Sequence, residues 1–137
     1  MKGVYAMKPR AGIILIQDGK LALIRRNKRG RTYYVVPGGG IEEGETKEEA
    51  ALREAKEELG VEVQIVKEVA TLYKERTHYY FLVEMKGGVF GTGEGEEMVN
   101  PSPQKGTYTP IWMDVFRLPR LSDFRPSEIL PIVMNES

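Results

Sequence analysis

Three glutamates, Glu54, Glu57 and Glu58, are spaced i, i+3 and i+4 in a segment whose composition is typical of a helix. At about 100° per residue, their side chains project from one face within roughly a third of the circumference. Like charges at this spacing repel, and each close pair costs a few tenths of a kcal/mol in an isolated helix. A hard cation such as Mg²⁺ would reverse the sign, because it takes oxygen ligands and usually keeps waters and substrate phosphates in its coordination sphere. The cluster therefore indicates a divalent-cation site for a phosphate-containing ligand.

The sequence around these glutamates forms an extended motif. It begins at Gly39 and ends at Val61, and reads glycine, five residues, glutamate, seven residues, then Arg-Glu-aliphatic-x-Glu-Glu-x-Gly-aliphatic. This pattern resembles the Nudix box of the Nudix hydrolases, and every fixed position is filled. Ala55 stands where the family more often has a larger aliphatic residue. The preceding residues 34–38 (YVVPG) resemble the aromatic-x-x-Pro-Gly segment that is common before the box.

The resemblance implies an activity and a set of metal ligands. Nudix hydrolases use Mg²⁺ or Mn²⁺ to hydrolyse a pyrophosphate bond in a nucleoside diphosphate linked to another moiety, X, and loops outside the box select X. By this resemblance, Glu54 and Glu58 are direct metal ligands. Glu57 is a ligand or bridges through water, and the carbonyl oxygen of Gly38 adds a further ligand.

Arg53 has two interpretations. It can reach acidic neighbours one turn away, and a surface ion pair of that kind is worth under about 1 kcal/mol. The resemblance instead implies that Arg53 pairs with a glutamate of the box, such as Glu45, and orients the site; we favour this role because the box is complete. The expected catalytic residues are Arg53, Glu54, Glu57, Glu58 and, from the segment 87–106, Glu97.

The general base has no clear position in the motif. A long segment rich in glycine and proline, residues 87–106, contains Glu94, Glu96 and Glu97. Loops of this length in a compact domain are usually functional or mobile. We predict that Glu97, and after it Glu96, supplies the base or an extra metal ligand, although a solvated acidic loop explains the same residues nearly as well.

Glycines and basic residues suggest where the substrate binds. A glycine triplet allows close approach of the backbone to a ligand, and we expect Gly39 and Gly40 to bind substrate. The basic segment 25–29 (RRNKR) either holds substrate phosphate, through Arg25 and Arg26, or forms a solvated end of a hairpin. The single histidine, His78, receives no role, because lone histidines are more often structural than catalytic.

The net charge of zero conceals an asymmetry. Residues 1–31 carry nine basic side chains and one acidic side chain, whereas residues 42–58 carry eight acidic and three basic ones. Opposite charges of this kind suit a polyanionic ligand held together with a divalent cation. Solvated surface charge explains the counts equally well.

The helix that must position the glutamates has recognisable ends. Thr46 is a suitable N-cap, with Glu49 three residues later to complete a capping box, and Gly60 is a suitable C-cap. Between the caps, the pattern predicts an apolar stripe whose centre lies about 120° around the helix from that of the carboxylates. The residues of this stripe are Ala51, Leu52, Ala55 and Leu59. We expect one face to pack on a sheet while the other faces a cleft.

The remaining pattern predicts strands on both sides of this helix. Residues 11–17 and 21–24 flank Asp18-Gly19 as a β-hairpin, followed by a basic loop at 25–31 and a strand at 32–36. Further strands are expected at 61–73, 77–85 and 107–115, and a terminal helix at 127–133 that Pro131 limits or kinks. This order predicts an α/β fold, and the resemblance implies a Nudix-type α/β/α sandwich with a central mixed β-sheet.

Length and composition narrow the class of protein further. A length of 137 residues with 41% hydrophobic and 29% charged residues predicts a single domain, residues 1–137. The absence of cysteine excludes disulfides and thiolate metal sites. No apolar run is long enough to span a membrane, and the N-terminus lacks the apolar core of a signal peptide, so we expect a cytoplasmic protein.

These observations favour an enzyme with a small nucleotide-type substrate, without a membrane or a stable nucleic-acid partner. A homodimer is compatible with the family, in which many members dimerise. The alternative is a nucleotide-binding Nudix module without catalysis, although such modules usually lose glutamates of the box. An isomerase of the isopentenyl diphosphate type shares the fold but would normally need a catalytic cysteine, and this chain has none.

Overall fold

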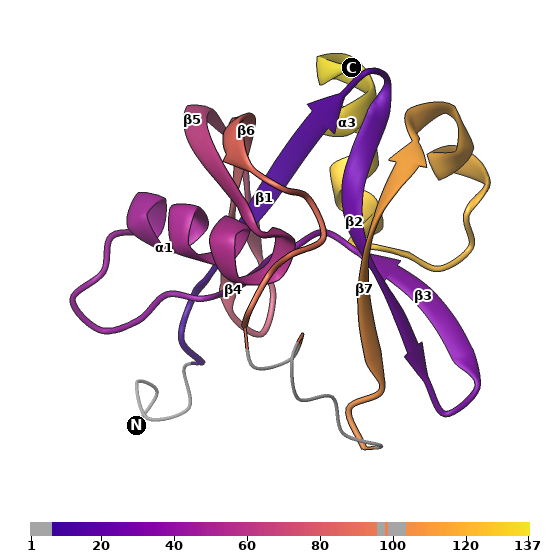
Figure 1. The fold of residues 1–137 in the computed structure, drawn as a ribbon, viewed down its shortest axis with the longest axis horizontal. Coiled ribbons are helices and arrows are strands. Elements are labelled where there is room, and N and C mark those ends of the chain that lie inside the picture. The colour runs from indigo at the N-terminus through magenta and orange to yellow at the C-terminus, as the bar shows by residue number, and fades with distance from the viewer. Residues whose placement is uncertain (1–6, 96–97, 99–103) are drawn as a thin grey trace.

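An eight-stranded mixed sheet lies between two helical layers in the computed structural model (Figure 1), which describes residues 7–95, 98 and 104–137. The strands are β1 (Arg10–Gln17), β2 (Lys20–Lys28), β3 (Arg31–Val35), β4 (Gly38–Gly40), β5 (Val61–Tyr73), β6 (Thr77–Gly88), β7 (Thr107–Asp114) and β8 (Phe124–Arg125). One helical layer is α1 (Lys47–Glu54) with its π-helical continuation η2 (Ala55–Leu59). The other contains the 3₁₀ turns η3 (Val115–Arg120) and η4 (Ser127–Ile129), and helix α3 (Leu130–Glu136). The expected α/β/α sandwich with a mixed sheet is therefore confirmed.

Strand β1 lies at the centre of both cores. Its side chains alternate between the faces of the sheet: Ala11, Ile13 and Leu15 pack toward α1, whereas Ile14 packs toward α3. All four residues have at most 1% of their surface exposed. A strand covered on both faces is expected to have a continuous apolar sequence, and this explains why residues 11–15 show no alternation of polarity.

The sheet opens on one side of β1. This strand pairs with β6 in parallel over residues 10–15, but with β2 only at Ile16 and Gln17. Along residues 10–12 its other neighbour is the short strand β4. Strands β1 and β4 therefore diverge from β2 and β3, as Figure 1 shows below the β1–β2 turn. We call the space between these two pairs of strands the split.

The structure confirms the first hairpin and corrects the second. Asp18 and Gly19 both have left-handed backbone angles (φ 52° and 75°) and join β1 to β2. The basic loop expected at 25–31 is wrong, because β2 continues to Lys28 and β3 begins at Arg31. The turn consists of Arg29 and Gly30 alone, with φ 54° and 79°. A two-residue turn with positive φ angles matches the twist of the strands that it joins. The basic residues 25–28 therefore belong to β2 and not to a loop.

The C-terminal elements differ from the prediction in detail. The expected helix begins as the 3₁₀ turn η4 and continues as α3 to Glu136. Pro131 lies in the first turn of α3, where its missing N–H breaks no helical bond, so it does not kink the helix. The short elements η3 and β8 are not predicted by the sequence, and neither is β4, whose glycines are typical of a loop. Strand β6 extends to Gly88, beyond the expected end at residue 85.

No helix among the described residues combines the length and the apolar character needed to cross a membrane.

Candidate active site

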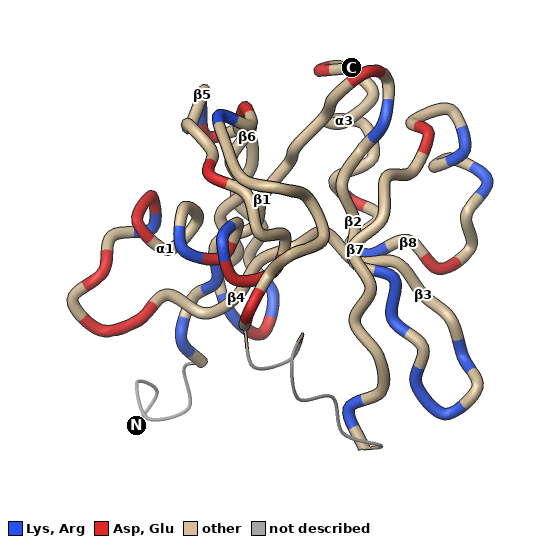
Figure 2. Tube along the Cα trace, viewed as in Figure 1, with Lys and Arg blue, Asp and Glu red and all other residues tan. Residues whose placement is uncertain are grey.

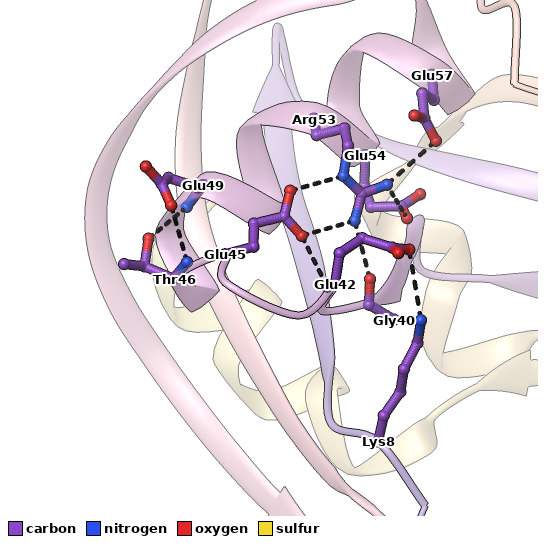
Figure 3. A network of polar contacts seen from close by, with 9 residues as sticks. All are labelled: Lys8, Gly40, Glu42, Glu45, Thr46, Glu49, Arg53, Glu54 and Glu57. Atoms are coloured by element: carbon purple, nitrogen blue, oxygen red, sulfur yellow. Dashed lines mark hydrogen bonds and ion pairs between the residues drawn. The ribbon is translucent and has the colours of Figure 1, made fainter.

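The helix that carries the glutamates begins where the sequence predicts. The side chain of Thr46 accepts a hydrogen bond from the backbone N–H of Glu49 (3.0 Å), and the Glu49 carboxylate accepts one from the N–H of Thr46 (2.9 Å) (Figure 3). This is the expected capping box. Gly60 ends the helical segment in the left-handed conformation, with φ 78°.

The last turn of the helix is wider than predicted. Residues 55–59 form a π-helical turn, and the N–H of Gly60 bonds to the carbonyls of both Ala55 and Lys56. A turn closed by i→i+5 bonds contains more residues than an α-helical turn, so Glu57 and Glu58 follow one another at a smaller angle than the 100° used in the prediction. Single π-turns inside helices occur frequently at functional sites.

Two of the three glutamates lie on the buried face of the helix. Glu54 and Glu58 have only 8% and 9% of their surface exposed, whereas the side chain of Glu57 is 44% exposed. The prediction that all three lie far from the packed face is therefore wrong. The apolar stripe also differs, because Leu52 is 41% exposed. The helical residues with no exposed surface are Ala50, Ala51, Ala55 and Leu59.

Small side chains explain this arrangement. Three alanines let the helix lie close to the sheet, so the longer stems of Glu54 and Glu58 extend past them to the edge formed by β4. There the N–H of Gly38 donates a hydrogen bond to Oε1 of Glu58 (2.9 Å). A Cβ atom on Gly39 would lie 2.1 Å from Oε2 of Glu54. Glycine is thus needed at residue 39 because the carboxylate occupies the space of a side chain.

Arg53 joins the glutamates into one network (Figure 3). Its Nε and Nη2 donate to the two carboxylate oxygens of Glu45, at 2.7 and 3.0 Å. Its Nη1 donates to Glu54 (2.9 Å) and Glu57 (3.2 Å), and Nη2 also donates to the carbonyl of Gly40 (2.9 Å). The pairing of Arg53 with Glu45 is confirmed. A planar guanidinium can satisfy this many acceptors at once, whereas a lysine ammonium cannot.

Charges within this network stabilise one another. The hydrogen bond to Glu45 raises the pKa of Arg53, against the opposing effect of burial, so its guanidinium stays protonated. The same bond lowers the pKa of Glu45 below its ordinary value of 4.5. Glu45 is therefore a carboxylate near neutral pH, and it fixes the guanidinium from the side opposite Glu54 and Glu57.

An open cavity of about 450 Å³ lies over this network. Its walls are the backbone of β4 and the carboxylates of the helix, with Arg53, Glu42, Glu94 and Gly95 at the margins. In the part of the chain that the structure describes, no three acidic or histidine side chains converge as a metal-binding group. Glu54 and Glu57 instead both bond to Arg53, and Glu58 bonds to Gly38.

The donor set nevertheless fits a hard divalent cation. Carboxylate oxygens are the ligands that Mg²⁺ and Mn²⁺ prefer, and Mg²⁺ usually binds through one or two carboxylates while keeping several waters. Glu54 and Glu58 are two nearly buried carboxylates beside an open cavity, and burial of charge favours a compensating cation. The assignment of Glu54, Glu57, Glu58 and Gly38 as metal ligands stays a prediction.

The two basic candidates occupy different places. Arg26 lines a second cavity of about 350 Å³, together with Glu58, Gly38 and Tyr108. Its guanidinium lies 3.6 Å from the centre of the Tyr108 ring and donates to the carbonyls of Lys105 and Thr107. Arg26 therefore holds the start of β7 against β2 beside this cavity. Arg25 is exposed, does not line the cavity, and as the preceding residue of β2 points to the other face of the sheet.

Charge is segregated across the molecule. Figure 2 shows acidic residues along α1 and the loop before it, and basic residues along β2 and β3. The acidic segment of the sequence thus lies on the α1 side of the split and the basic segment 25–31 on the other, although α1 also carries Lys47, Arg53 and Lys56. Of the candidate bases, Glu94 is exposed at the margin of the 450 Å³ cavity, and Glu96 and Glu97 lie outside the described residues.

Sequence reasoning missed Tyr108 and Arg10, which line the 350 Å³ cavity. Tyr108 pairs with Arg26 across β2 and β7, and these residues are 82 positions apart in the chain. No local signal in the sequence gives that register. In the sequence, Arg10 is distinguished only as one of the nine basic residues in the segment 1–31.

Comparisons with known proteins agree on one family. A family model described as NUDIX domain matches residues 7–127. An RNA pyrophosphohydrolase of Gluconobacter oxydans is 46% identical over 56 residues, which are 40% of this chain and 33% of that protein. An ADP-ribose pyrophosphatase of Methanocaldococcus jannaschii is 36% identical over 90 residues, which are 59% of this chain and 53% of that protein. With both of these relatives, the match spans less than two thirds of the relative's length.

Solved structures show the same fold. The crystal structure of an ADP-ribose pyrophosphatase from Streptococcus suis superposes with a TM-score of 0.69 at 21% identity. The superposition covers 94% of this chain and 90% of that one. The crystal structure of a UDP-X diphosphatase gives a TM-score of 0.67 at 19% identity, over 96% of this chain and 63% of that one.

Proposed function

The chain belongs to the NUDIX domain family, and from this premise we propose that it hydrolyses a pyrophosphate bond with the help of Mg²⁺ or Mn²⁺. The proposed substrate is a nucleoside diphosphate linked to another moiety, X. The observation that carries the proposal is the pair of nearly buried carboxylates of Glu54 and Glu58. They lie against the glycines of β4, beside an open cavity. Relatives named as pyrophosphohydrolases and pyrophosphatases support the same reaction class.

The proposed roles follow from the chemistry of the bond. A pyrophosphate carries negative charge on both phosphoryl groups, which repels an attacking hydroxide. The cation, when bound, neutralises this charge and lowers the pKa of a bound water. Glu54 and Glu58 would hold it, and the more exposed Glu57 would bind it directly or through water. The carbonyl of Gly38 would add an oxygen ligand.

The remaining residues would orient the reacting groups. Arg53 fixes the positions of Glu54 and Glu57 by hydrogen bonds, so its proposed role is to keep both carboxylates directed at the cavity. Gly39 and Gly40 would bring the backbone of β4 next to the diphosphate. Glu97, and after it Glu96, remains our proposed base or additional metal ligand. Single-domain organisation, a cytoplasmic location and a homodimer also stay predictions.

A substrate panel tests the proposal directly. We expect turnover of at least one pyrophosphate among ADP-ribose, nucleotide sugars, dinucleoside polyphosphates, nucleoside triphosphates and 5′-triphosphorylated RNA. Turnover should require added Mg²⁺ or Mn²⁺ and stop with excess chelator. Reaction in ¹⁸O-water, read by ³¹P NMR and mass spectrometry, should place one ¹⁸O on a phosphate product. Saturable binding without turnover across the panel would favour the sensor alternative.

Gly39→Ala is expected to lower kcat by about 10-fold or more while leaving the fold intact. The new Cβ would require the Glu54 carboxylate, now 2.1 Å away, to move, and small displacements of catalytic groups can cost about 10²-fold. The thermal unfolding midpoint should fall less than kcat, because the new Cβ meets a side-chain carboxylate and not the backbone. Gly87→Ala is the matched control, since its Cβ would meet only the end of the exposed Glu62, at 3.2 Å. Normal kcat and metal affinity in Gly39→Ala would contradict the assignment of Glu54.

A further inference from the structure

A third cavity lies near the residues that line the 350 Å³ cavity, and its wall is basic. It has a volume of about 170 Å³. Its floor is apolar and includes Val35, Val36, Leu72 and Tyr80, and its polar side chains are Arg10, Lys74, His78 and Arg125. We call this cavity the cationic pocket. None of these four polar side chains has a role in the proposed hydrolysis.

The cationic pocket adjoins the cavity that contains Glu58. The two share Arg10, Val35 and Val36 as lining residues. The first is also lined by Tyr108, which packs against the core beneath α1, and the second by Tyr80, which belongs to the core beneath α3. A ligand that occupies both cavities must therefore pass these three shared residues.

The positive charge of the cationic pocket is only partly compensated. The guanidinium of Arg10 has no hydrogen bond or ion pair with another described side chain, and that of Arg125 is packed over the ring of Tyr33 at 4.4 Å. Lys74 pairs with Glu128 at 2.9 Å. Burial, and then the charges of Arg10, Arg76 and Lys74, lower the pKa of His78. Cations that depress a neighbouring histidine in this way create a field that favours an anion.

We propose that the cationic pocket binds a second phosphate group of the substrate, carried by moiety X at a distance from the bond that is cleaved. This inference rests on the proposed function and narrows its substrate class to a pyrophosphate whose X is itself phosphorylated. The diphosphate lies at Glu54 and Glu58, and the distal phosphate is held by Arg10, Lys74 and Arg125. The linking part of X passes the residues that both cavities share, Arg10, Val35 and Val36. The apolar floor suits the uncharged part of X between the two phosphates.

Glu128 is the acidic group that competes for this position. Its side chain and that of Lys74 are 48% and 44% exposed, so their pair is a surface ion pair of small net worth. Lys74 can therefore exchange Glu128 for a phosphate. Removing the carboxylate should strengthen phosphate binding, whereas removing the cations should weaken it.

The single histidine makes the pocket observable without turnover. His78 is the only histidine of the chain, so its ring signals in ¹H–¹⁵N NMR report on this pocket alone. With divalent cations removed, titration with inorganic phosphate should shift these signals saturably and raise the pKa of His78. Lys74→Gln/Arg125→Gln should weaken this binding at least about tenfold, and Glu128→Gln should strengthen it several-fold. Lys20→Gln/Arg117→Gln changes the net charge equally at exposed residues that line none of the three cavities, and should leave binding unchanged.

Matched ligands then test the link to the substrate. NADH and NADPH are pyrophosphates that differ by one phosphate remote from the pyrophosphate bond. In metal-free buffer, the wild-type protein should bind NADPH more tightly, and the Lys74→Gln/Arg125→Gln protein should lose that preference. Absence of a saturable His78 shift, or equal weakening by both double variants, would overturn the inference. Hydrolysis of the substrate panel tests only the proposed function, whereas phosphate and NADPH binding test only the cationic pocket. Either proposal can therefore fail while the other holds.

Discussion

Glu58→Gln is expected to lower kcat by roughly 10²- to 10³-fold, the scale on which loss of one preorganised charged group acts in an active site. The amide oxygen of glutamine can still accept the hydrogen bond that Glu58 receives from Gly38, so the contact between η2 and β4 survives. What disappears is the negative charge that would hold a cation beside the diphosphate. The effect should therefore fall on metal affinity and kcat, and leave the unfolding midpoint within a few degrees of the wild-type value.

Glu62→Gln is the matched control for this experiment, because Glu62 is an exposed glutamate that pairs only with Lys56 at the surface. It should retain wild-type kinetics. Both variants are measured for kcat against Mg²⁺ concentration and for Mg²⁺ binding by calorimetry with a nucleotide present. Wild-type turnover in Glu58→Gln, with unchanged metal dependence, would remove Glu58 from the site.

Arg53→Lys is expected to lower kcat by about 10²-fold and the free energy of unfolding by about 1–3 kcal/mol. Lysine keeps the charge but cannot bond in plane to both oxygens of Glu45 while also reaching Glu54, Glu57 and the carbonyl of Gly40. The carboxylates would then repel one another without a fixed partner. Chemical denaturation gives the stability change, and steady-state kinetics gives kcat and KM.

The two effects of Arg53→Lys can be separated. If Arg53 only stabilised the fold, kcat would recover at temperatures well below the unfolding midpoint; as a positioning residue, it should leave kcat and the Mg²⁺ dependence altered at every temperature. Arg117→Lys, at an exposed arginine of η3, should change neither quantity. Wild-type kcat in folded Arg53→Lys protein would contradict the positioning role.

Acid should weaken the same network in a defined window. Because Arg53 lowers the pKa of Glu45 from its ordinary 4.5, the pair contributes stability that is fully present above that value. This contribution is lost as the pH falls through the lower pKa of the folded state. The difference in unfolding free energy between wild-type protein and Glu45→Gln should therefore be constant above about pH 5 and shrink below it. A difference that does not vary with pH between 3 and 7 would contradict the pairing.

Local signals in the sequence were sufficient for the elements that hold the site. The capping box at Thr46 and Glu49, the left-handed Gly60 and the turn at Asp18-Gly19 are each decided by neighbouring residues, and the structure has all of them. The motif likewise placed the glutamates, Arg53 and the glycines of β4 together. All of them come from one continuous segment that forms a short strand and a helix.

The errors arose where tertiary packing decides the outcome. Leu52 was expected in the core on polarity, but Ala50 occupies that position because a small residue lets the helix lie close to the sheet. A regular 100° step could not anticipate the π-turn that reorients Glu57 and Glu58. The contact of Arg26 with Tyr108 and the meeting of Arg10 with His78 depend on strand register between segments far apart in the chain.

The three alanines on the buried face of the helix have a consequence for how the site could change over evolution. Ala50, Ala51 and Ala55 act as a spacer whose thickness sets how far both buried carboxylates stand from the glycine edge. A larger residue at any of them would lift the whole helix, and Glu54 and Glu58 would withdraw together. Substitutions at residues that contact no ligand could thus change the width of the 450 Å³ cavity between the helix and β4.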